Sequence, residues 1–179
     1  SKHSMPFSPN ISSRRYLANI PERGDVIVFK TPADNRTDYI KRVIGLPGDS
    51  IQLINGNLYI NSTQVEKNKL NLSFEINCGG EILSVTAFEE VLPNNKKYIS
   101  VYRTEGTMKN TDKFLVPDNH FFFMGDNRDC SKDSRFLSSV GYVHFNNLVG
   151  KARIIFFSNN KKVGSFFKFW KWNKSMRFK

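Results

Sequence analysis

Short runs of alternating apolar and polar residues are common along this chain, and helical repeats are scarce. Alternation places successive side chains on opposite faces of a strand, so it predicts strands over Asp25–Lys30 and Tyr39–Ile44. Residues 51–61 predict a hairpin, because Asn55-Gly56 separates two alternating arms and favours a two-residue turn. Further strands are predicted at Tyr98–Arg103, Phe114–Val116, Phe121–Met124 and Ala152–Phe157. Many short strands divided by Gly, Pro and Asn turns indicate an all-β or β-rich domain.

The composition changes over residues 63–112, which are rich in Asn and Lys and alternate less clearly. This stretch includes the turn-like Asn77-Cys78-Gly79-Gly80. We therefore expect an inserted, smaller β-rich subdomain at 63–112 between the two halves of one core, at 1–62 and 113–160, and a tail at 161–179. A chain of 179 residues is long enough for one domain with a large insertion.

Basic residues outnumber acidic ones by 27 to 16, which gives a formal net charge of +11. Such an excess favours polyanionic partners, meaning nucleic acid or an anionic bilayer surface. The tail at 161–179 carries seven Lys or Arg, no acid and several Phe and Trp. This mixture suits the lipid headgroup region, and the alternative is that the tail packs its aromatics on its own domain. No stretch reaches the roughly 20 mostly apolar residues of a membrane-spanning helix.

The sequence holds few residues in patterns that bind metals. Cys78 and Cys130 permit one disulfide at most and match no zinc spacing, and they leave the redox compartment open. His3, His120 and His144 are isolated, so each is expected to be a surface or core residue rather than a ligand or a base. We expect neither a metal nor a cofactor.

The strand predicted at Tyr39–Ile44 carries two adjacent cations. Alternation places Lys41 on one face between the apolar groups of Tyr39 and Val43, and Arg42 on the other face. Apolar surroundings penalise the ammonium form, so the pKa of Lys41 falls and its neutral amine can serve as a general base. Arg42 cannot take this role, because a guanidinium does not deprotonate in proteins. The alternative is that both are exposed edge-strand charges that discourage aggregation.

A polar loop, GDNRDCSKDSR at residues 125–135, follows the apolar strand predicted at Phe121–Met124. Acids and arginines are mixed along it: Asp126, Arg128, Asp129, Asp133 and Arg135. Such a mixture can form a self-neutralising network of ion pairs and Asx-turns that stiffens the loop. The spacing of the acids could suggest calcium, but the cations among them argue against a site that needs negative oxygen ligands. From these residues alone, an ordinary ion-paired turn is the commoner interpretation.

Three stretches together resemble a known family. RGDVIVF at 23–29, YIKRVIGLPGD at 39–49 and GDNRDCSKDSR at 125–135, in that order, resemble bacterial type I signal peptidases, the membrane-bound Ser/Lys proteases that cleave signal peptides. The similarity runs over most of the chain, and GLPGD after a lysine-bearing strand, followed at a distance by GDNR-x-x-S-x-DSR, is highly specific. The resemblance implies a mainly β fold with an antiparallel, barrel-like catalytic core that carries the inserted subdomain.

The resemblance also implies roles for single residues. Lys41 matches the general base that takes the proton of a nucleophilic serine, and Ser131 matches the hydroxyl that orients the lysine amine. The other matched positions are the site-supporting Asp126, Asp133 and Arg135, and the substrate-binding strand residues Asp38, Tyr39 and Ile40. A Ser/Lys pair needs a neutral amine, and a carboxylate beside the lysine would restore the ammonium, so a hydroxyl suits the chemistry. Cys130 departs from the small polar residue that is usual in the family.

Ser4, in HSMPFSP at residues 3–9, matches the family's nucleophile poorly. The family motif reads Ser-Met-x-Pro-Thr, whereas here the proline falls one place early and the threonine is missing. Ser4 also precedes Lys41 by 37 residues, fewer than is usual in the family. We therefore expect Ser4 to be a loop residue. We expect the nucleophile and a membrane span to lie upstream of Ser1, so that this chain alone is inactive.

The resemblance implies a serine endopeptidase that removes signal peptides from translocated preproteins. Its expected partners are preprotein signal peptides and the membrane lipid surface, without nucleic acid, and its expected place is the cytoplasmic membrane with the catalytic domain on the periplasmic side. Two alternatives stay open: a related Ser/Lys peptidase of pilus maturation, and a non-enzymatic basic β-barrel that binds nucleic acid through Lys and Arg with stacking Phe and Tyr. The second leaves GDNRDCSKDSR unexplained.

Overall fold

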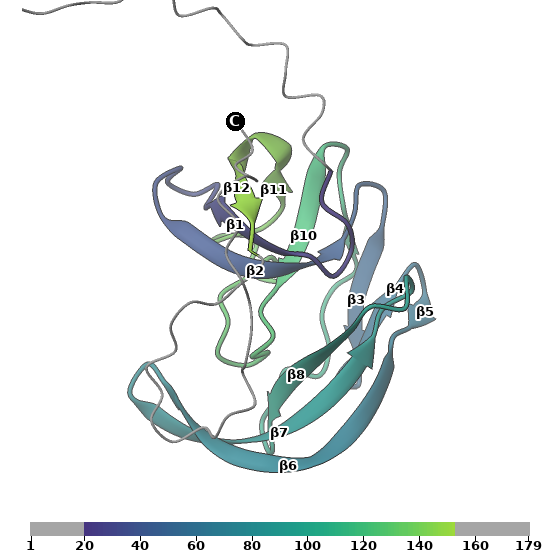
Figure 1. The fold of residues 1–179 in the computed structure, drawn as a ribbon, viewed down its shortest axis with the longest axis vertical. Helices are drawn as coiled ribbons and strands as arrows, with labels where there is room; N and C mark the ends of the chain where they lie inside the picture. Colours follow the sequence, from purple (N-terminus) through teal and green to yellow (C-terminus); the bar gives the residue numbers. More distant parts are fainter. Residues whose placement is uncertain (1–19, 153–179) are drawn as a thin grey trace, which may run out of the picture.

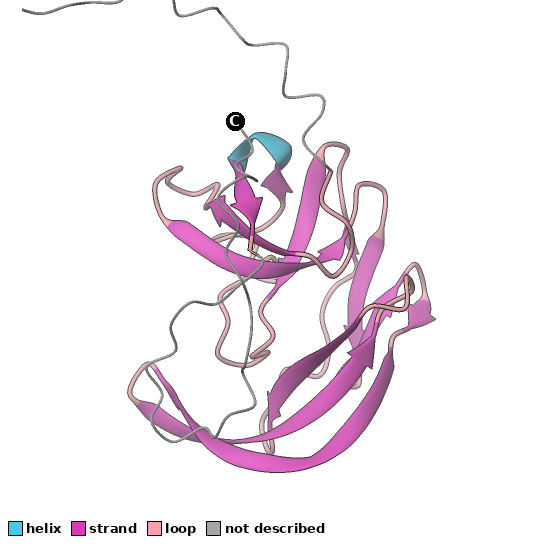
Figure 2. Cartoon of the chain, viewed as in Figure 1, coloured by secondary structure: helices cyan, strands magenta, loops and turns pink. Residues whose placement is uncertain are grey.

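The computed structural model describes residues 20–152, which form three antiparallel β-sheets (Figures 1 and 2). The five-stranded sheet has the order β11 (Val143–His144), β10 (His120–Met124), β2 (Asp38–Gly45), β1 (Val26–Lys30) and β12 (Leu148–Lys151). The four-stranded sheet has the order β5 (Thr63–Gln64), β4 (Asn57–Ile60), β3 (Ser50–Ile54) and β9 (Phe114–Leu115). The three-stranded sheet has the order β6 (Glu66–Cys78), β7 (Glu81–Val91) and β8 (Lys97–Arg103).

Apart from these strands, residues 20–152 contain one short 3-10 turn, Phe145–Asn147, and no α-helix. The mainly β, antiparallel class is therefore confirmed. Within the same residues, no helix has the length and apolar character needed to cross a bilayer.

Most strands predicted from alternation are present within one or two residues of the expected bounds. The hairpin of β3 and β4 turns at Asn55 and Gly56, which both have positive φ (50° and 76°), as a two-residue hairpin turn of this kind requires. The strand start predicted at Ala152 is wrong, because β12 ends at Lys151, and residues 153–157 lie outside the described part. β12 pairs with β1, but its sequence LVGK shows no clear alternation that would reveal it.

The region with the weakest alternation contains the two longest strands. β6 and β7 form a long hairpin, and β8 pairs with β7 from Val85 to Val91. The pattern is obscured in β6 because the register shifts between Lys69 and Ser73 and because most of its side chains are exposed. Figure 1 shows this sheet as a curved layer below the five-stranded sheet. It lies within the predicted insertion 63–112, whose limits stay a prediction.

β10 is buried on both faces and joins two apolar clusters. Phe121 and Phe123 pack into one cluster with residues of β1 and β2, while Phe122 and Met124 pack into the other with residues of β3 and β4. Alternate residues of a strand face opposite sides, so one strand can fill both clusters. Phe123 stacks on Phe29 with ring centroids 4.5 Å apart. The polar loop at 125–135 therefore begins from one of the most firmly packed strands in the fold.

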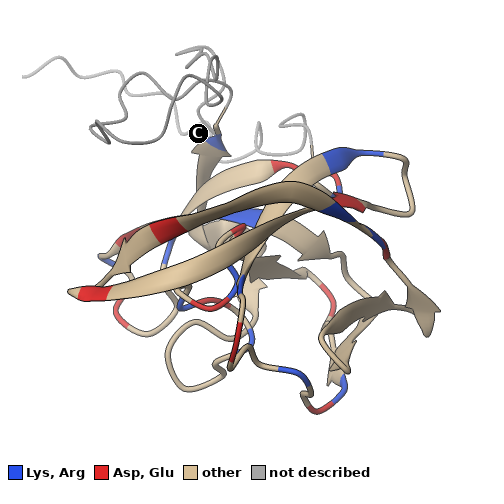
Figure 3. Ribbon diagram, turned by 90° about the horizontal axis from the view of Figure 1, so that it is seen from below, with Lys and Arg blue, Asp and Glu red and all other residues tan. Residues whose placement is uncertain are grey.

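Charges of both signs are interspersed over the described strands and loops (Figure 3). All 16 acidic residues and 16 of the 27 basic residues lie within residues 20–152, which therefore carry no net formal charge. The whole excess of +11 belongs to residues 1–19 and 153–179. The β-sheets themselves thus lack the basic surplus on which a nucleic-acid-binding barrel would depend.

Candidate active site

Lys41 lies in the middle of β2 and is half-buried. Its amine nitrogen lies 5.5 Å from the centroid of the Tyr39 ring on the same face of the strand. Burial lowers the pKa of Lys41, although the negative charges of Asp133 and Asp126 act in the opposite direction. Among the described residues, this amine forms no hydrogen bond or ion pair. Lys41 therefore lies in a partly buried niche and is not an exposed charge on an edge strand.

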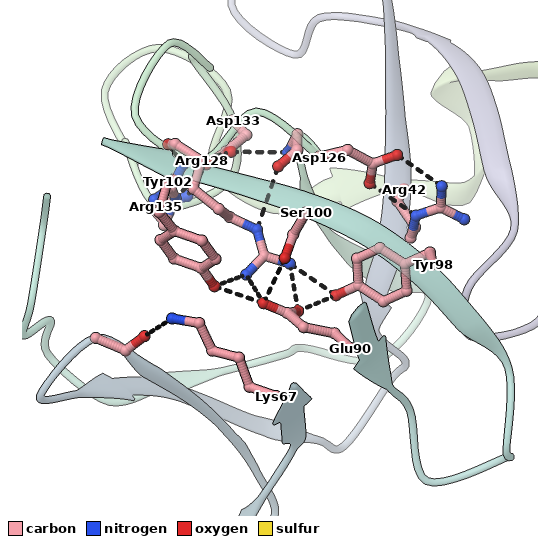
Figure 4. A network of polar contacts seen from close by, with 12 residues as sticks. Arg42, Lys67, Glu90, Tyr98, Ser100, Tyr102, Asp126, Arg128, Asp133 and Arg135 are labelled. Atoms are coloured by element: carbon pink, nitrogen blue, oxygen red, sulfur yellow. Dashed lines mark hydrogen bonds and ion pairs between the residues drawn. The ribbon is translucent and has the colours of Figure 1, made fainter. Parts of the chain in front are cut away.

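Arg42 projects from the other face of β2 and ties that strand to the polar loop (Figure 4). Its Nε and Nη2 donate to the two carboxylate oxygens of Asp126 at 2.7 and 2.6 Å, and its Nη1 donates to the Gly24 carbonyl at 2.8 Å. The guanidinium also lies 4.5 Å from the centroid of the Tyr98 ring. A two-point arginine–carboxylate contact fixes both distance and direction, so the start of the loop is held against β2.

Ser131 is packed against the first residue of the loop. An added Cβ at Gly125 would lie 2.1 Å from the Ser131 Oγ, so no larger residue fits there without displacing the serine. Gly125 follows Met124, which is paired with Arg42 between β10 and β2, and Ser131 is therefore placed beside the part of β2 that carries Lys41. Its hydroxyl oxygen is buried and has no hydrogen-bond partner among the described residues. Since buried polar groups are nearly always paired, this hydroxyl is available to a further partner.

Asp133 and Arg135 close the far end of the loop. Asp133 is fully buried, and its carboxylate accepts a hydrogen bond from the Gly125 N–H at 2.9 Å. Arg135 donates to both oxygens of Asp133 at 2.8 Å, and its Nη2 also donates to the Arg128 carbonyl at 2.5 Å. These contacts draw the two ends of the loop together around Ser131.

The loop is not self-neutralising, contrary to what its sequence suggests. Only the pair between Asp133 and Arg135 forms inside it. Asp126 pairs with Arg42 of β2, and Asp129 accepts hydrogen bonds from residues 103, 107 and 108. Arg128 points toward the three-stranded sheet. The reason is that the partners of these groups are distant in sequence and are brought to the loop by the fold.

A buried polar network that sequence reasoning missed surrounds Arg128 (Figure 4). Glu90 of β7 binds its guanidinium at 2.9 and 2.7 Å, and the side chains of both residues are 1% exposed. The other members are Tyr98, Ser100 and Tyr102 of β8. The segment YISVY carried a signal, since a period of two places its three hydroxyl residues on one face of a strand. The acid opposite them could be found only from the register that pairs Glu90 with Tyr98.

Burial by itself raises the pKa of Glu90, but the charge and hydrogen bonds of Arg128, together with the hydroxyls of Tyr102 and Tyr98, lower it to about 2. Burial likewise raises the pKa of both tyrosines, so their hydroxyls stay protonated and donate to the carboxylate. The network therefore consists of one buried anion and one buried cation that neutralise each other.

Cys78 and Cys130 form a disulfide, which the two-cysteine count permitted. Their Cα atoms lie 5.7 Å apart, and the bond spans 52 positions of sequence. Cys78 is the last residue of β6, at the turn into β7, and Cys130 directly precedes Ser131. The departure from the family pattern at position 130 is therefore a covalent link between the loop and the three-stranded sheet.

Asp38, Tyr39 and Ile40 are the first three of the eight residues of β2. They pair with β1 on one side, whereas β10 pairs with β2 only at Arg42 and beyond. Within residues 20–152, no strand pairs with the second side of Asp38–Lys41. The side chain of Ile40 is half-exposed, and Asp38 forms a surface ion pair with Lys30. A free backbone edge thus leads directly to Lys41.

The structure brings together the predicted Lys41, Ser131, Asp126, Asp133 and Arg135 around the junction of β2 and β10. Two further predictions, the loop role of Ser4 and the lipid contacts of the tail at 161–179, fall outside the described residues.

Comparison with known proteins places most of the chain in one family. Residues 7–157 match the family described as signal peptidase, peptidase S26. The chain is 42% identical over 152 residues to signal peptidase I of Rickettsia typhi, covering 80% of this chain and 55% of the relative. It is 42% identical over 167 residues to signal peptidase I of Rickettsia prowazekii, covering 88% and 61%. The chain thus spans little more than half the length of the curated relatives it matches.

Among solved structures, a signal peptidase I from Enterococcus faecalis is 25% identical, with a TM-score of 0.42 and coverage of 72% of this chain and 93% of that chain. The family and the named relatives favour neither the pilus-maturation peptidase nor the nucleic-acid-binding barrel.

Proposed function

Because this chain belongs to the signal peptidase family, peptidase S26, we propose that its complete gene product is a serine endopeptidase that removes signal peptides from translocated preproteins. One observation carries the proposal. The half-buried amine of Lys41, which lacks an ion pair among the described residues, lies on the strand beside which the buried and unpartnered hydroxyl of Ser131 is held. A partly buried amine and a hydroxyl with a free hydrogen-bonding capacity are the two groups that a Ser/Lys peptidase needs beside its nucleophile.

In the proposed reaction, the neutral amine of Lys41 takes the proton of a nucleophilic serine while that serine attacks the scissile carbonyl. The C–N bond then breaks, the leaving amine receives a proton from the lysine, and an ester joins the substrate to the serine. Lys41 next activates a water molecule that hydrolyses this ester. Burial favours this role because it disfavours the ammonium form, and Ser131 orients the amine without adding negative charge.

The attacking serine is not assigned to any described residue. The roles proposed for the remaining site residues are structural: Asp126 holds the loop to β2, and Asp133 with Arg135 closes it around Ser131.

The substrate is proposed to bind as an added strand along Asp38, Tyr39 and Ile40. The second side of these residues has no strand partner in the described structure, so its N–H and C=O groups are available for main-chain hydrogen bonds. Such a peptide would run along β2 toward Lys41. Shallow pockets beside this edge would then select small side chains near the scissile bond.

The signal peptidase I family is membrane-associated, and the finer placement proposed for this protein is the cytoplasmic membrane with the catalytic domain on the periplasmic side. The excess of basic residues outside residues 20–152, and the Phe and Trp residues at 161–179, suit contact with an anionic lipid surface.

The test is cleavage of a preprotein by the complete gene product and its single variants. Lys41→Ala should lower kcat by at least about 1000-fold, because the general base is lost, and Ser131→Ala should lower it by roughly 10- to 100-fold. Lys132→Ala is the matched control, since Lys132 is an exposed cation next to Ser131, and its kcat should stay within about twofold of wild type. Undiminished cleavage by Lys41→Ala would overturn the proposal.

A further inference from the structure

The loop that carries Ser131 is bound to the three-stranded sheet at five successive positions, residues 126–130. The partners, in order, are Val101 for residues 126, 127 and 128, Arg103 for Asp129 and Cys78 for Cys130. Both backbone contacts with Val101 are 2.9 Å long, and the bond from the Arg103 N–H to Asp129 is 2.7 Å long. The three-stranded sheet therefore holds residues 126–130 of the loop in place.

Arg128 also binds this sheet through its side chain, in an ion pair with Glu90 in which both side chains are fully buried. Each oxygen of Glu90 accepts one bond from Arg128, and the remaining capacity is taken by hydroxyls of Tyr98, Ser100 and Tyr102. A guanidinium cannot shed its charge, so Arg128 can stay buried only while an anion faces it. Glu90 is the acid that faces it in the described structure.

Arg128 passes this restraint on to both sides of Ser131. Its Nε donates to the Gly125 carbonyl at 3.3 Å, and its own carbonyl accepts from Arg135 at 2.5 Å. Arg135 donates a hydrogen bond to the carboxylate of Asp133, which also accepts one from the Gly125 N–H. Because the Ser131 side chain rests on Gly125, a displacement of Arg128 would move the surface that positions the hydroxyl.

We propose that Glu90 is a positioning residue of the peptidase reaction: through Arg128 it holds Gly125 and Asp133, and thereby keeps the Ser131 hydroxyl beside the strand that carries Lys41. This inference rests on the proposed function. Glu90 does not touch the reacting groups, and its contribution is made entirely through the loop. The inserted sheet is accordingly part of the catalytic framework.

The experiment measures kcat and KM of the complete gene product for a preprotein substrate in Glu90→Gln, alone and combined with Ser131→Ala. Glutamine keeps the size of the side chain and removes its charge. Glu90→Gln alone should lower kcat roughly 10- to 100-fold with KM within about twofold, since a misplacement of about 1 Å costs up to 100-fold. In the Ser131→Ala background the same change should lower kcat by less than about twofold, because there is no hydroxyl left to position.

The matched control is Glu89→Gln, which removes the neighbouring acid of the same strand. Glu89 forms a surface ion pair with Lys97, so its loss should leave kcat unchanged in both backgrounds. Tyr102→Phe provides a milder perturbation of the same network, with one hydroxyl removed, should Glu90→Gln fold poorly. It should lower kcat by a few-fold, again only when Ser131 is present.

Equal losses from Glu90→Gln or Tyr102→Phe with and without Ser131 would overturn the inference, because they would mean a general structural effect. No loss in either background would overturn it as well. Amide hydrogen exchange tests the role of Glu90 separately from the proposed function, because the measurement does not require enzymatic activity. Faster exchange at residues 125–135 in Glu90→Gln than in Glu89→Gln supports the loop restraint even if wild type cleaves no preprotein, and unchanged exchange overturns it.

Discussion

Removing the disulfide between Cys78 and Cys130 should lower the free energy of unfolding by about 4 kcal/mol. The bond joins residues 52 positions apart. For a loop of this length, the chain-entropy relation predicts that cross-linking removes about 14 cal/mol/K from the unfolded state, which amounts to about 4 kcal/mol at 25 °C. A domain of ordinary stability has about 5–15 kcal/mol in total, so the loss is a large fraction of it.

The folded state should survive this change, because residues 126–129 keep their hydrogen bonds and the buried ion pair to the three-stranded sheet. Urea unfolding of wild type and of the double variant Cys78→Ser/Cys130→Ser measures the difference, and with an m-value of about 2 kcal/mol/M the midpoint should fall by about 2 M. Wild type under a reducing agent serves as the control and should unfold like the variant. A difference below about 1 kcal/mol would refute the reasoning, as would two titratable thiols in the untreated folded protein.

The pKa of Glu90 is about 2 in the folded protein against 4.5 for an ordinary glutamate, so its stabilising effect is fully present above pH 4.5 and is lost as the pH falls from 4.5 to 2. The difference in urea stability between wild type and Glu90→Gln should therefore shrink by on the order of 3 kcal/mol from pH 7 to pH 2, and a constant difference would contradict this. The kcat for preprotein cleavage should rise with pH and then reach a plateau, because the neutral amine of Lys41 is the active form. The apparent pKa of this rise should lie below 10.5, because burial lowers the pKa of Lys41. A profile that rises only at or above pH 10.5 would contradict the assignment. Gly125→Ala should cost about 1–3 kcal/mol in thermal unfolding, since its Cβ would lie 2.1 Å from the Ser131 Oγ. Adding Ser131→Gly should recover most of that loss, and no recovery would mean that the two groups do not collide.

Strands such as β3, β4 and β8 were predictable because buried and more exposed side chains alternate along them. In β3, for example, Ile51 and Leu53 are buried while Gln52 between them is partly exposed. The same alternation placed Lys41 and Arg42 on opposite faces of β2, as observed. It failed in β6, where the register shifts and every residue is exposed or partly exposed, and in β12, whose LVGK segment has no clear pattern.

The motifs of the candidate site can be recognised in the sequence, but the partners of their charges cannot. The composition of the polar loop predicts that it neutralises itself, whereas Asp126 pairs with Arg42 and Arg128 pairs with Glu90, 84 and 38 positions away. Ion pairing depends on distance in space, and nothing in the order of residues records which strand faces a loop. The period-two spacing of Tyr98, Ser100 and Tyr102 is visible in the sequence, but its meaning requires the register of β7 against β8.

Local order of residues was thus sufficient for most of the predicted strands, the Asn-Gly turn and the family, because these follow from side-chain alternation and from contiguous motifs. The same motifs single out Lys41 and Ser131 as candidates. The burial that lowers the pKa of Lys41, the choice of Glu90 as the counter-ion of Arg128 and the pairing of Cys78 with Cys130 arise from the packing of distant strands. Each is set by the register and curvature of whole sheets, which depend on all the strands at once.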